Sequence, residues 1–396
     1  MKYLLPVILL FLNFLEPATS AASGCDAKCT FSAGNLTSAT IGSFPTTCAK
    51  ICTTRIIISN NTGLTEQQLT NAFKNMKTLV GGLEIWNTDF SSLKFLANLE
   101  RIESGMEFIT IKENQKLVEL GLSSLTTIIG VDFSVYQNYK MTRLNLPKLK
   151  TISIDGVVIK GDFPYPPRGT YIQIETNHPT DFCATADEMR VFLSRKTNVP
   201  FVGGKVCPPA KFTPKICKTP AETCVELFGD LNIGPKFAVK NVKNLKILYG
   251  SLIMKNTNFT DFKFLKNLTH IVQSNDNKVT MNVQGNKKLT SMAFPKLQLV
   301  MCETFDWGTF RPKEAVVFKN NHASLLRDVE SCYALAEAFR DHDMANPTVN
   351  GMMCYELAAK FPPTTKKATP KKGTTKKGTT KKGTTKKTTT KKPSGK

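Results

Sequence analysis

The chain has 396 residues, a length suited to two domains of roughly 150 residues each. Hydrophobic residues make up 41% of it and aromatic residues 9%, which is typical of packed cores and excludes a wholly disordered protein. The formal net charge is +22, but the last 33 residues, from Thr364, hold 13 lysines and no acidic residue, so the rest carries only +9. We therefore do not expect a nucleic-acid-binding core.

Residues 1–22 have the pattern of a secretory signal peptide. Lys2 precedes the apolar run Leu4–Leu15, and small residues follow at 18–22. The run is too short to span a bilayer, and no later stretch reaches the eighteen or so apolar residues that a span needs. The lysine-rich C-terminus is unlike a lipid-anchor signal. We therefore expect a secreted, extracellular protein without a membrane span.

The chain contains 11 cysteines, which fit an oxidising compartment and indicate disulfides. Cys25, Cys29, Cys48 and Cys52 form two C-x3-C pairs, but zinc sites favour tighter knuckles with supporting histidines, so no metal site is predicted. Their disulfide pairing stays open. The odd count leaves one thiol over, and Cys302 is the candidate.

Four N-x-S/T motifs predict N-glycosylation in a secreted protein. Their asparagines are Asn35, Asn60, Asn258 and Asn267.

A segment of 22 residues occurs twice, at 81–102 and 250–271, with 11 identical positions at a constant offset of 169. This identity indicates an internal duplication. A smaller unit, L-x-x-L-x-x-I, recurs within each half, for example at Leu96, Leu99 and Ile102. Alternating strands follow these units, with predicted inward positions Ile85, Ile111, Val135 and Ile159. Their spacing of 24 to 26 residues is typical of a solenoid of stacked parallel strands.

The strand that contains Ile85 predicts further local structure. Asn87 should end the strand, with its amide satisfying backbone groups in the turn. Trp86 should point away from the core, either exposed for recognition or covered by a helix predicted at 65–76, and both readings stay open. Thr65 and Gln68 form a capping box for that helix.

Both halves end in a helical pattern that carries a cysteine. Thr180 and Asp181 should start the first helix, which a bridge from Cys183 to Cys207 would tie to the solenoid. The second would be tied by Cys332 and Cys354, and a further bridge, Cys217 to Cys224, should open the second half.

The duplicated strands "GGLEIWNT" and "GSLIMKNT", the L-x-x-L-x-x-I units and the two Cys-bearing helices resemble the receptor L domain, which occurs in pairs in insulin- and EGF-receptor ectodomains. The resemblance covers about residues 47–356. It implies a mainly β fold with short helices, built from two tandem leucine-rich-repeat-like, right-handed β-helical solenoids. It also implies that ligands contact a sheet face, but it assigns no contact residue. The long cysteine-rich module between the receptor L domains is missing here, and neither a membrane span nor a kinase follows.

The expected organisation has six parts. They are a signal peptide (1–22), a Cys/Thr-rich segment (23–46), a first L domain (47–207), a Pro-rich linker (208–216), a second L domain (217–356) and a disordered Lys/Thr-rich tail (357–396).

The leading functional hypothesis is a secreted, non-catalytic receptor-like binding protein, such as a soluble carrier or decoy for insulin-like or growth-factor-like peptides. The alternative is an extracellular matrix or surface protein that its lysine and threonine tail holds to acidic glycans. An enzyme is not expected, because the four histidines are scattered and no catalytic motif occurs. No cofactor and no nucleic-acid partner are expected.

Overall fold

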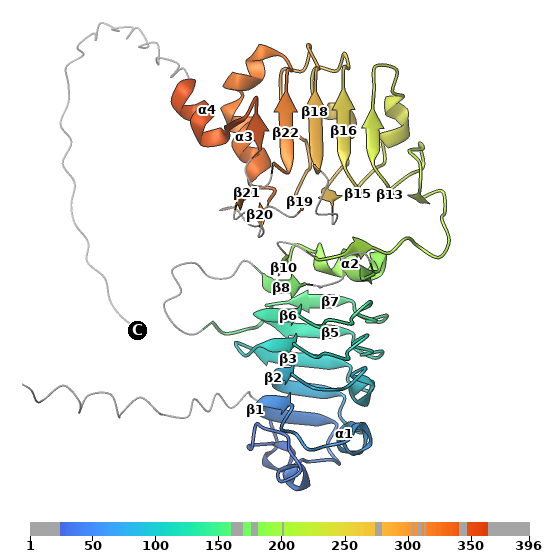
Figure 1. Cartoon of the computed structure of the whole chain (residues 1–396), viewed down its shortest axis with the longest axis vertical. Coiled ribbons are helices and arrows are strands. Elements are labelled where there is room, and N and C mark those ends of the chain that lie inside the picture. Colours follow the sequence, from blue (N-terminus) through green and yellow to red (C-terminus); the bar gives the residue numbers. More distant parts are fainter. Residues whose placement is uncertain are drawn as a thin grey trace, which may run out of the picture. The chain divides into compact units, whose positions relative to one another are not determined.

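The computed structural model describes residues 24–159, 169–175, 181–199, 202–273, 279–302, 305–306, 311–312, 314–339 and 347–362. Residues up to Pro362 form one compact unit. The fold is mainly β, with a few short helices (Figure 1). The predicted signal peptide and the part of the predicted tail from residue 363 onward lie outside the described residues. The predicted start of the tail at residue 357 is wrong, because residues 357–360 belong to helix α4 (Cys354–Lys360) and Leu357 is fully buried.

The first half is built on one parallel sheet with the strand order β10-β8-β6-β4-β2-β3-β5-β7, in which β1 also pairs with β2. The long strand β2 serves both sides, because residues 78–80 pair with β3 and residues 83–86 with β4. After β2 the chain alternates between the two sides, and each turn, which we call a rung, adds one strand to each. The strands are β1 (Lys50–Ser59), β2 (Thr78–Trp86), β3 (Arg101–Gly105), β4 (Ile109–Lys112), β5 (Thr127–Gly130), β6 (Asp132–Tyr136), β7 (Thr151–Ser153), β8 (Thr170–Ile174), β9 (Cys183–Ala184), β10 (Thr197–Asn198) and β11 (Lys205–Val206).

The second half repeats this plan with two separate sheets, ordered β12-β13-β15-β17-β19 and β14-β16-β18-β22-β23-β24. Its strands are β12 (Ile216–Cys217), β13 (Glu226–Phe228), β14 (Leu231–Ile233), β15 (Ile247–Tyr249), β16 (Leu252–Lys255), β17 (His270–Val272), β18 (Met281–Gln284), β19 (Leu299–Met301), β20 (Phe305–Asp306), β21 (Arg311–Pro312), β22 (Val316–Lys319), β23 (Thr348–Val349) and β24 (Met352–Met353).

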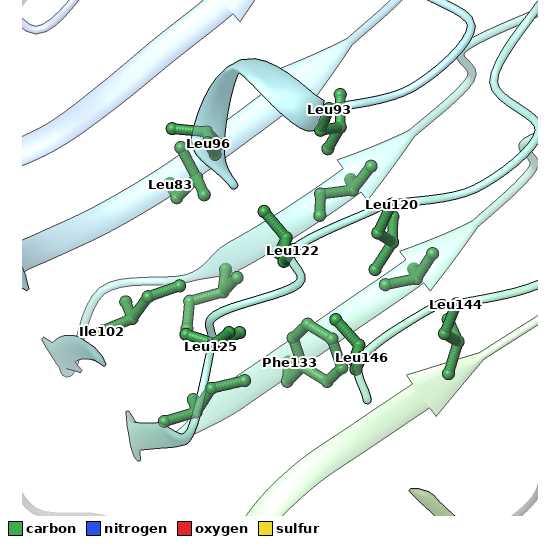
Figure 2. Close-up of a cluster of buried hydrophobic side chains, with 14 of the residues drawn as sticks. Leu83, Leu93, Leu96, Ile102, Leu120, Leu122, Leu125, Phe133, Leu144 and Leu146 are labelled. Atoms are coloured by element: carbon green, nitrogen blue, oxygen red, sulfur yellow. The ribbon is translucent and has the colours of Figure 1, made fainter. Parts of the chain in front are cut away.

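Aliphatic side chains fill the space inside the rungs. Leu83, Leu93 and Leu120 are fully buried, and Figure 2 shows such leucines from successive rungs packed side by side. The predicted inward positions Ile85, Ile111 and Val135 are confirmed, because each is 0% exposed. Stacking is what buries this face, since each rung covers the apolar side chains of its neighbours.

The fourth predicted inward position, Ile159, is wrong. It is half-buried and lies in no strand, and the strand that pairs with β6 is β8, whose Ile174 lies opposite Val135. The third rung is therefore longer than a 24-residue period allows. A fixed period cannot anticipate an insertion within one rung.

Each rung turns a corner after its strand through a residue with positive φ. Asn87 has φ 53°, Glu113 58° and Gln137 54° in the first half. Left-handed backbone is unfavourable for most residues other than glycine, and among these asparagine is one of those that tolerate it best. The strand does end before Asn87, but backbone conformation, not the amide, suits this residue to the corner.

The amides that bond to backbone groups at the corners belong to Asn114 and Asn138, which directly follow the second and third corner residues, and not to Asn87. The Oδ1 of Asn114 accepts from the backbone N–H and hydroxyl of Thr88 at 3.0 and 2.7 Å, and its Nδ2 donates to the carbonyl of Ile85 at 3.1 Å. The Oδ1 of Asn138 accepts in turn from the backbone N–H of Asn114 at 3.1 Å. Asn286 and Asn321 form the same ladder in the second half. We call this arrangement the asparagine ladder.

Short helices cover the return side and the ends of the rungs. They are α1 (Glu66–Phe73), α2 (Ala186–Phe192), α3 (Val329–Ala336), α4 (Cys354–Lys360) and the 3-10 turns η1 (Ala27–Cys29), η2 (Ile41–Ser43), η3 (Lys94–Leu96), η4 (Val239–Val242), η5 (Lys263–Leu265) and η6 (Ala323–Arg327). The capping box of Thr65 and Gln68 is confirmed for α1. The helix α2 begins later than predicted, since Thr185 caps it through Glu188. That pair satisfies the capping pattern, whereas Asp181 lies outside the helix.

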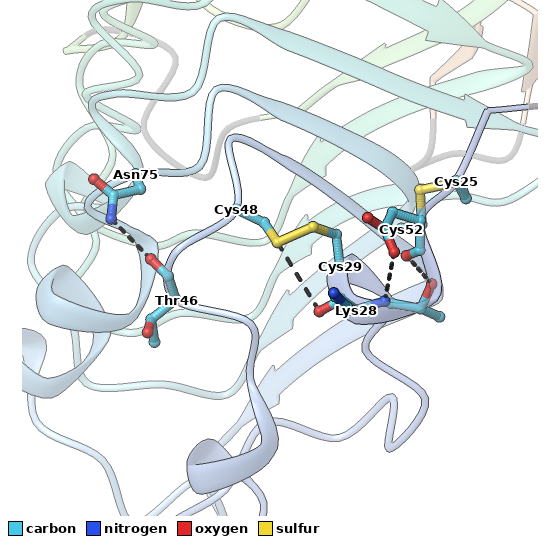
Figure 3. Close-up of a disulfide and its surroundings, with 9 residues drawn as sticks. Cys25, Lys28, Cys29, Thr46, Cys48, Cys52 and Asn75 are labelled. Carbon is cyan, nitrogen blue, oxygen red and sulfur yellow. Dashed lines mark hydrogen bonds between the residues drawn. A yellow bond between two sulfur atoms is a disulfide. The ribbon is translucent and has the colours of Figure 1, made fainter.

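The N-terminal cysteines, whose pairing the sequence left open, form the disulfides Cys25–Cys52 and Cys29–Cys48 (Figure 3). The segment they hold packs into the core of the first half through buried Phe31, Leu36 and Phe44. Isolated bridges join it to β1, at Thr30↔Cys52 and Asn35↔Ile57. It therefore covers the open edge of β1.

Candidate protein-binding surface

Outward side chains of β1, β2, β4, β6 and β8 form rows across the first half, because parallel register aligns equivalent positions. In one row Trp86 of β2 pairs with Lys112 of β4, and Lys112 pairs with Tyr136 of β6. Each follows an inward residue that is fully buried, and each is itself half-buried. Trp86 therefore points outward, as alternation predicts.

Lys112 contacts the tyrosine of this row and the glutamate that follows it in the chain. The Lys112 Nζ lies over the Tyr136 ring, 5.9 Å from its centroid, and 3.2 Å from the Glu113 carboxylate. The hydrogen bond to Glu113 raises the pKa of Lys112, so its ammonium stays charged at neutral pH. A cation flanked by two aromatic residues is thus fixed on the sheet surface.

Two further aromatic residues lie at the other end of the same strands. Phe108, next to the first residue of β4, is 54% exposed, and Tyr171 of β8 is 40% exposed. Between the two ends, Arg55 bridges Glu84 and Glu107, each at 2.9 Å. We call Trp86, Phe108, Lys112, Tyr136 and Tyr171 the aromatic face.

Gly82 leaves the centre of the aromatic face without a protruding β2 side chain. A Cβ at this position would lie 3.0 Å from the Phe108 carbonyl oxygen and 3.2 Å from the Arg55 Cβ. The side chains of Arg55 and Glu107 therefore meet across the backbone of β2. A flat sheet with charged groups in the middle and aromatic groups at both ends results.

Helix α1 lies on the return side of the rungs, where it packs against η3. Trp86 sits instead at the carboxyl end of β2, in register with Ser59 and Lys112. Of the two readings that the sequence left open, the structure favours the outward one that contributes to a surface.

A buried carboxylate underlies the aromatic face. Asp132, the first residue of β6, is 9% exposed and accepts a hydrogen bond from the Ser134 hydroxyl at 2.7 Å. Burial raises the pKa of Asp132, and the Ser134 bond offsets this only in part. Asp132 lies in register with Tyr171.

The remaining predicted cysteines are placed at the ends of the two halves. The structure joins Cys183 to Cys207, Cys217 to Cys224 and Cys332 to Cys354. Cys302 is in none of these bridges and is buried at 3% exposure.

The four predicted glycosylation sites differ in their surroundings. Asn35, Asn60 and Asn258 are exposed. Asn267 is half-buried, and its Nδ2 donates to the Lys243 carbonyl on the preceding rung at 2.7 Å. Asn98 makes the equivalent bond to Lys74 in the first half at 2.9 Å. The Asn267 side chain thus takes part in a contact between rungs.

Other chemistry-bearing residues are dispersed. His270 contacts Thr269 and the Leu193 carbonyl, and His322 caps η6. His178, His342 and Trp307 lie outside the described residues. Within the described ranges, no group of three or more His, Cys, Asp or Glu side chains is arranged to hold a metal ion. None of the helices in that part of the chain is long and apolar enough to cross a membrane.

Helix α2 joins the first half to the first sheet of the second half. Its Arg190 forms a two-pronged ion pair with Glu226 of β13, with both N–O distances 2.9 Å. Tyr249, Val272, Leu299 and Met301 of the second half belong to the same buried cluster as the first core. Burial raises the pKa of the Tyr249 hydroxyl, so it stays neutral.

Comparison with known proteins agrees with this architecture. The family model for the receptor L domain matches residues 47–133 and 223–334, one match in each half and together about half of the chain. No curated protein and no solved structure matches the chain. On the strength of the family match in each half, the chain belongs to the receptor L domain family.

Proposed function

We propose that this protein is an extracellular, non-catalytic receptor-like protein that binds a protein or peptide ligand on the aromatic face. The receptor L domain is a ligand-binding module without catalytic activity, and its ligands are generally proteins. The observation that carries the proposal is the row Trp86–Lys112–Tyr136 together with exposed Phe108 and Tyr171. Tryptophan and tyrosine are enriched among the few residues that dominate the energetics of protein interfaces.

The face fits a folded peptide hormone better than a small molecule. The charged groups at its centre already pair with one another, since Arg55 forms ion pairs with both Glu84 and Glu107. Affinity must therefore come from the aromatic ends, which bury apolar area against the ligand. Insulin-like or growth-factor-like peptides are the ligands we propose, with the protein acting as a soluble carrier or decoy in the right-handed β-helical arrangement of its family.

The signal-peptide pattern, the disulfides and the sequons support secretion and glycosylation of the mature chain. We further propose the domain limits 47–207 and 217–356 for the two L domains. The 13 lysines from Thr364 onward support a second role, in which the tail holds the protein to acidic glycans of the extracellular matrix.

The test is binding of the full-length protein to immobilised insulin-like and EGF-like peptides at physiological salt. We expect the double variant Trp86→Ala/Tyr136→Ala to lose at least tenfold in affinity, since interface aromatic anchors cost about 2 kcal/mol or more each when truncated. The matched control is Lys255→Ala/Lys319→Ala at the equivalent positions of the second half.

Three results decide between the roles. A loss confined to Trp86→Ala/Tyr136→Ala supports ligand capture on the aromatic face. Equal losses of affinity in both double variants would show that the aromatic face is not part of the binding site. A full-length protein whose tail lysines are all changed to glutamine separates the second role, because attachment to acidic glycans should then weaken while peptide binding is unchanged.

A further inference from the structure

The return side of the second half carries an excess of lysines. Three successive return segments, residues 234–246, 257–269 and 286–298, contain nine lysines and one acidic residue, Asp261. The corresponding segments of the first half, 88–100, 114–126 and 138–150, contain six basic and three acidic residues. The duplicated segments have therefore diverged strongly in charge.

Ion pairs cross the rungs of the first half but leave most of these lysines unneutralised in the second. Lys94 pairs with Glu119 at 2.8 Å, and Lys116 pairs with Asp89 at 3.2 Å, so each of the first two return segments contributes one cation and one carboxylate to these pairs. In the second half, Glu222 pairs with Lys243 and Asp261 with Lys263. Within the described residues, no carboxylate forms an ion pair with Lys240, Lys246, Lys266 or Lys296.

Hydrogen bonds between rungs place these lysines on one continuous surface. The Lys243 carbonyl accepts from Asn267, and the Asn267 Oδ1 accepts from the Lys296 ammonium at 3.5 Å. The Lys246 carbonyl accepts from the backbone of Thr269, whose own carbonyl accepts from Gln298. Three consecutive rungs thus present lysines side by side. We call Lys240, Lys243, Lys246, Lys263, Lys266 and Lys296 the lysine ridge.

The spacing of the ridge follows from the strands beneath it. Parallel strands lie on the order of 5 Å apart, so the ridge advances by about that distance with each rung. All six lysines are exposed. Such a regular line of ammonium groups repels itself and attracts counterions, and a linear polyanion that displaces them gains free energy from their release.

We propose that the lysine ridge is a binding site for a sulfated polysaccharide. Its occupant is a linear chain of sulfate groups that lies across the three rungs of the second half. The site is on the folded part of the protein, so it is distinct from the lysines of the tail. It also lies on the return side of the rungs and away from the outward strands that form the aromatic face.

A variant with an uncharged tail, which we call the neutral-tail protein, separates binding at the lysine ridge from binding by the tail. In the full-length chain, all 13 lysines from Thr364 onward are changed to glutamine, and binding to a heparin decasaccharide is measured over a range of salt concentrations. N-glycans are trimmed with an endoglycosidase, because the sequons at Asn258 and Asn267 both lie on the middle rung, and Asn267 contacts Lys243 and Lys296 of the ridge. We expect binding to persist at 0.15 M salt and to weaken linearly in log–log form as salt rises.

Two triple variants in that background locate the site. Lys240→Gln/Lys266→Gln/Lys296→Gln should lower heparin affinity roughly tenfold and reduce the salt slope by about 2, as expected for the loss of three anion contacts. The control Lys140→Gln/Lys148→Gln/Lys150→Gln removes the same charge from exposed positions of the first half and should change affinity less than about twofold.

Three outcomes would overturn the proposal. They are loss of all binding in the neutral-tail protein, equal losses in the two triple variants, or equally tight binding of a poly-glutamate peptide with the same charge. The last would assign the ridge to an acidic protein. Because the readout is heparin affinity, failure here would leave capture of a peptide on the aromatic face unaffected.

Discussion

The two halves use the same scaffold to present different surfaces. Register aligns Trp86, Lys112 and Tyr136 in the first half, and Lys255, Gln284 and Lys319 occupy the corresponding row of the second. The corners behind these rows are nearly identical, since Thr88 and Thr257 bond to Asn114 and Asn286 in the same way. Packing and buried hydrogen bonds constrain the inward and corner positions, whereas outward positions are free to diverge.

The consequence is a division of chemistry between the halves. The first half carries aromatic residues on its outward strands and cross-rung ion pairs on its return side. In the second half, the corresponding row of β16, β18 and β22 has lysine and amide side chains, and the return side carries the lysine ridge. A duplicated module has thereby acquired one surface suited to a protein and another suited to a polyanion.

The strongest test of the shared scaffold is removal of the asparagine ladder. Asn114→Ala and Asn286→Ala should each lower the free energy of unfolding by about 3 kcal/mol or more, because several buried backbone groups lose their partners at about 1–3 kcal/mol each. Urea unfolding followed by circular dichroism measures the loss. Asn232→Ala, at an exposed strand position, is the matched control and should cost less than about 0.5 kcal/mol. A large loss in one half and none in the other would show that the two ladders are not equivalent.

Sequence patterns predicted the repeated features of this fold well. The repeat period and the duplication identify the buried leucines and the inward Ile85, Ile111 and Val135. The spacing of Thr65 and Gln68 identifies the capping box of α1. All of these features depend on local spacing. The asparagine ladder was missed although its signal was present. Thr88, Asn114 and Asn138 recur at the rung period, one residue after each corner, whereas the prediction used only Asn87.

Features that depend on contacts between distant residues could not be predicted. The insertion before β8 breaks the period, so Ile159 was placed in a strand that does not exist. The aromatic face needs the register between strands, since Phe108 and Tyr171 share no motif with Trp86. Prediction of the lysine ridge would need both the alignment of the rungs and the ion pairs, because lysine content alone does not show which ammonium groups are neutralised.

The contact between the halves provides the next largest expected effect. Arg190→Ala leaves the Glu226 carboxylate, whose side chain is only 13% exposed, without its guanidinium partner. We expect a loss of roughly 2 kcal/mol, below the 3–5 kcal/mol of a fully buried pair because Arg190 is 34% exposed. Scanning calorimetry should show a lower and broader transition. Asp187→Ala is the control, since Asp187 is 86% exposed, and an equal loss there would contradict the role of Glu226.

Replacing the asparagines of the two sequons of the second half should lower the free energy of unfolding by different amounts. In protein without N-glycans, Asn267→Ala should cost about 1 kcal/mol, the typical net value of the hydrogen bond to the Lys243 carbonyl. Asn258→Ala should cost less than about 0.5 kcal/mol, because Asn258 is exposed. Asn98→Ala, the first-half equivalent, should match Asn267→Ala. If Asn258→Ala proved as costly as Asn267→Ala, the bond to the preceding rung would not be the cause.

The smallest effect concerns the buried carboxylate under the aromatic face. Alignment through the two ladders places Asp132 where the second half has Ala315, which is also buried. Burial raises the pKa of Asp132 in the folded protein. At a pH below the pKa that Asp132 has in the unfolded chain, Asp132 holds its proton in both the folded and the unfolded state. As pH rises from there, the unfolded state ionises first, so Asp132 makes folding less favourable until its folded pKa has been passed.

Asp132→Asn should remove this dependence and keep an acceptor for the Ser134 hydroxyl. The variant should therefore melt at a higher temperature than the natural protein at pH 7, and the difference should shrink towards pH 3. Thermal unfolding at several pH values measures this difference. Ala315→Ser, which adds an uncharged polar group at the second-half position, controls for polarity and should show no such pH dependence. A gain for Asp132→Asn that stayed constant from pH 3 to 7 would mean that shape and not charge is responsible, and the two halves would then differ here only in packing.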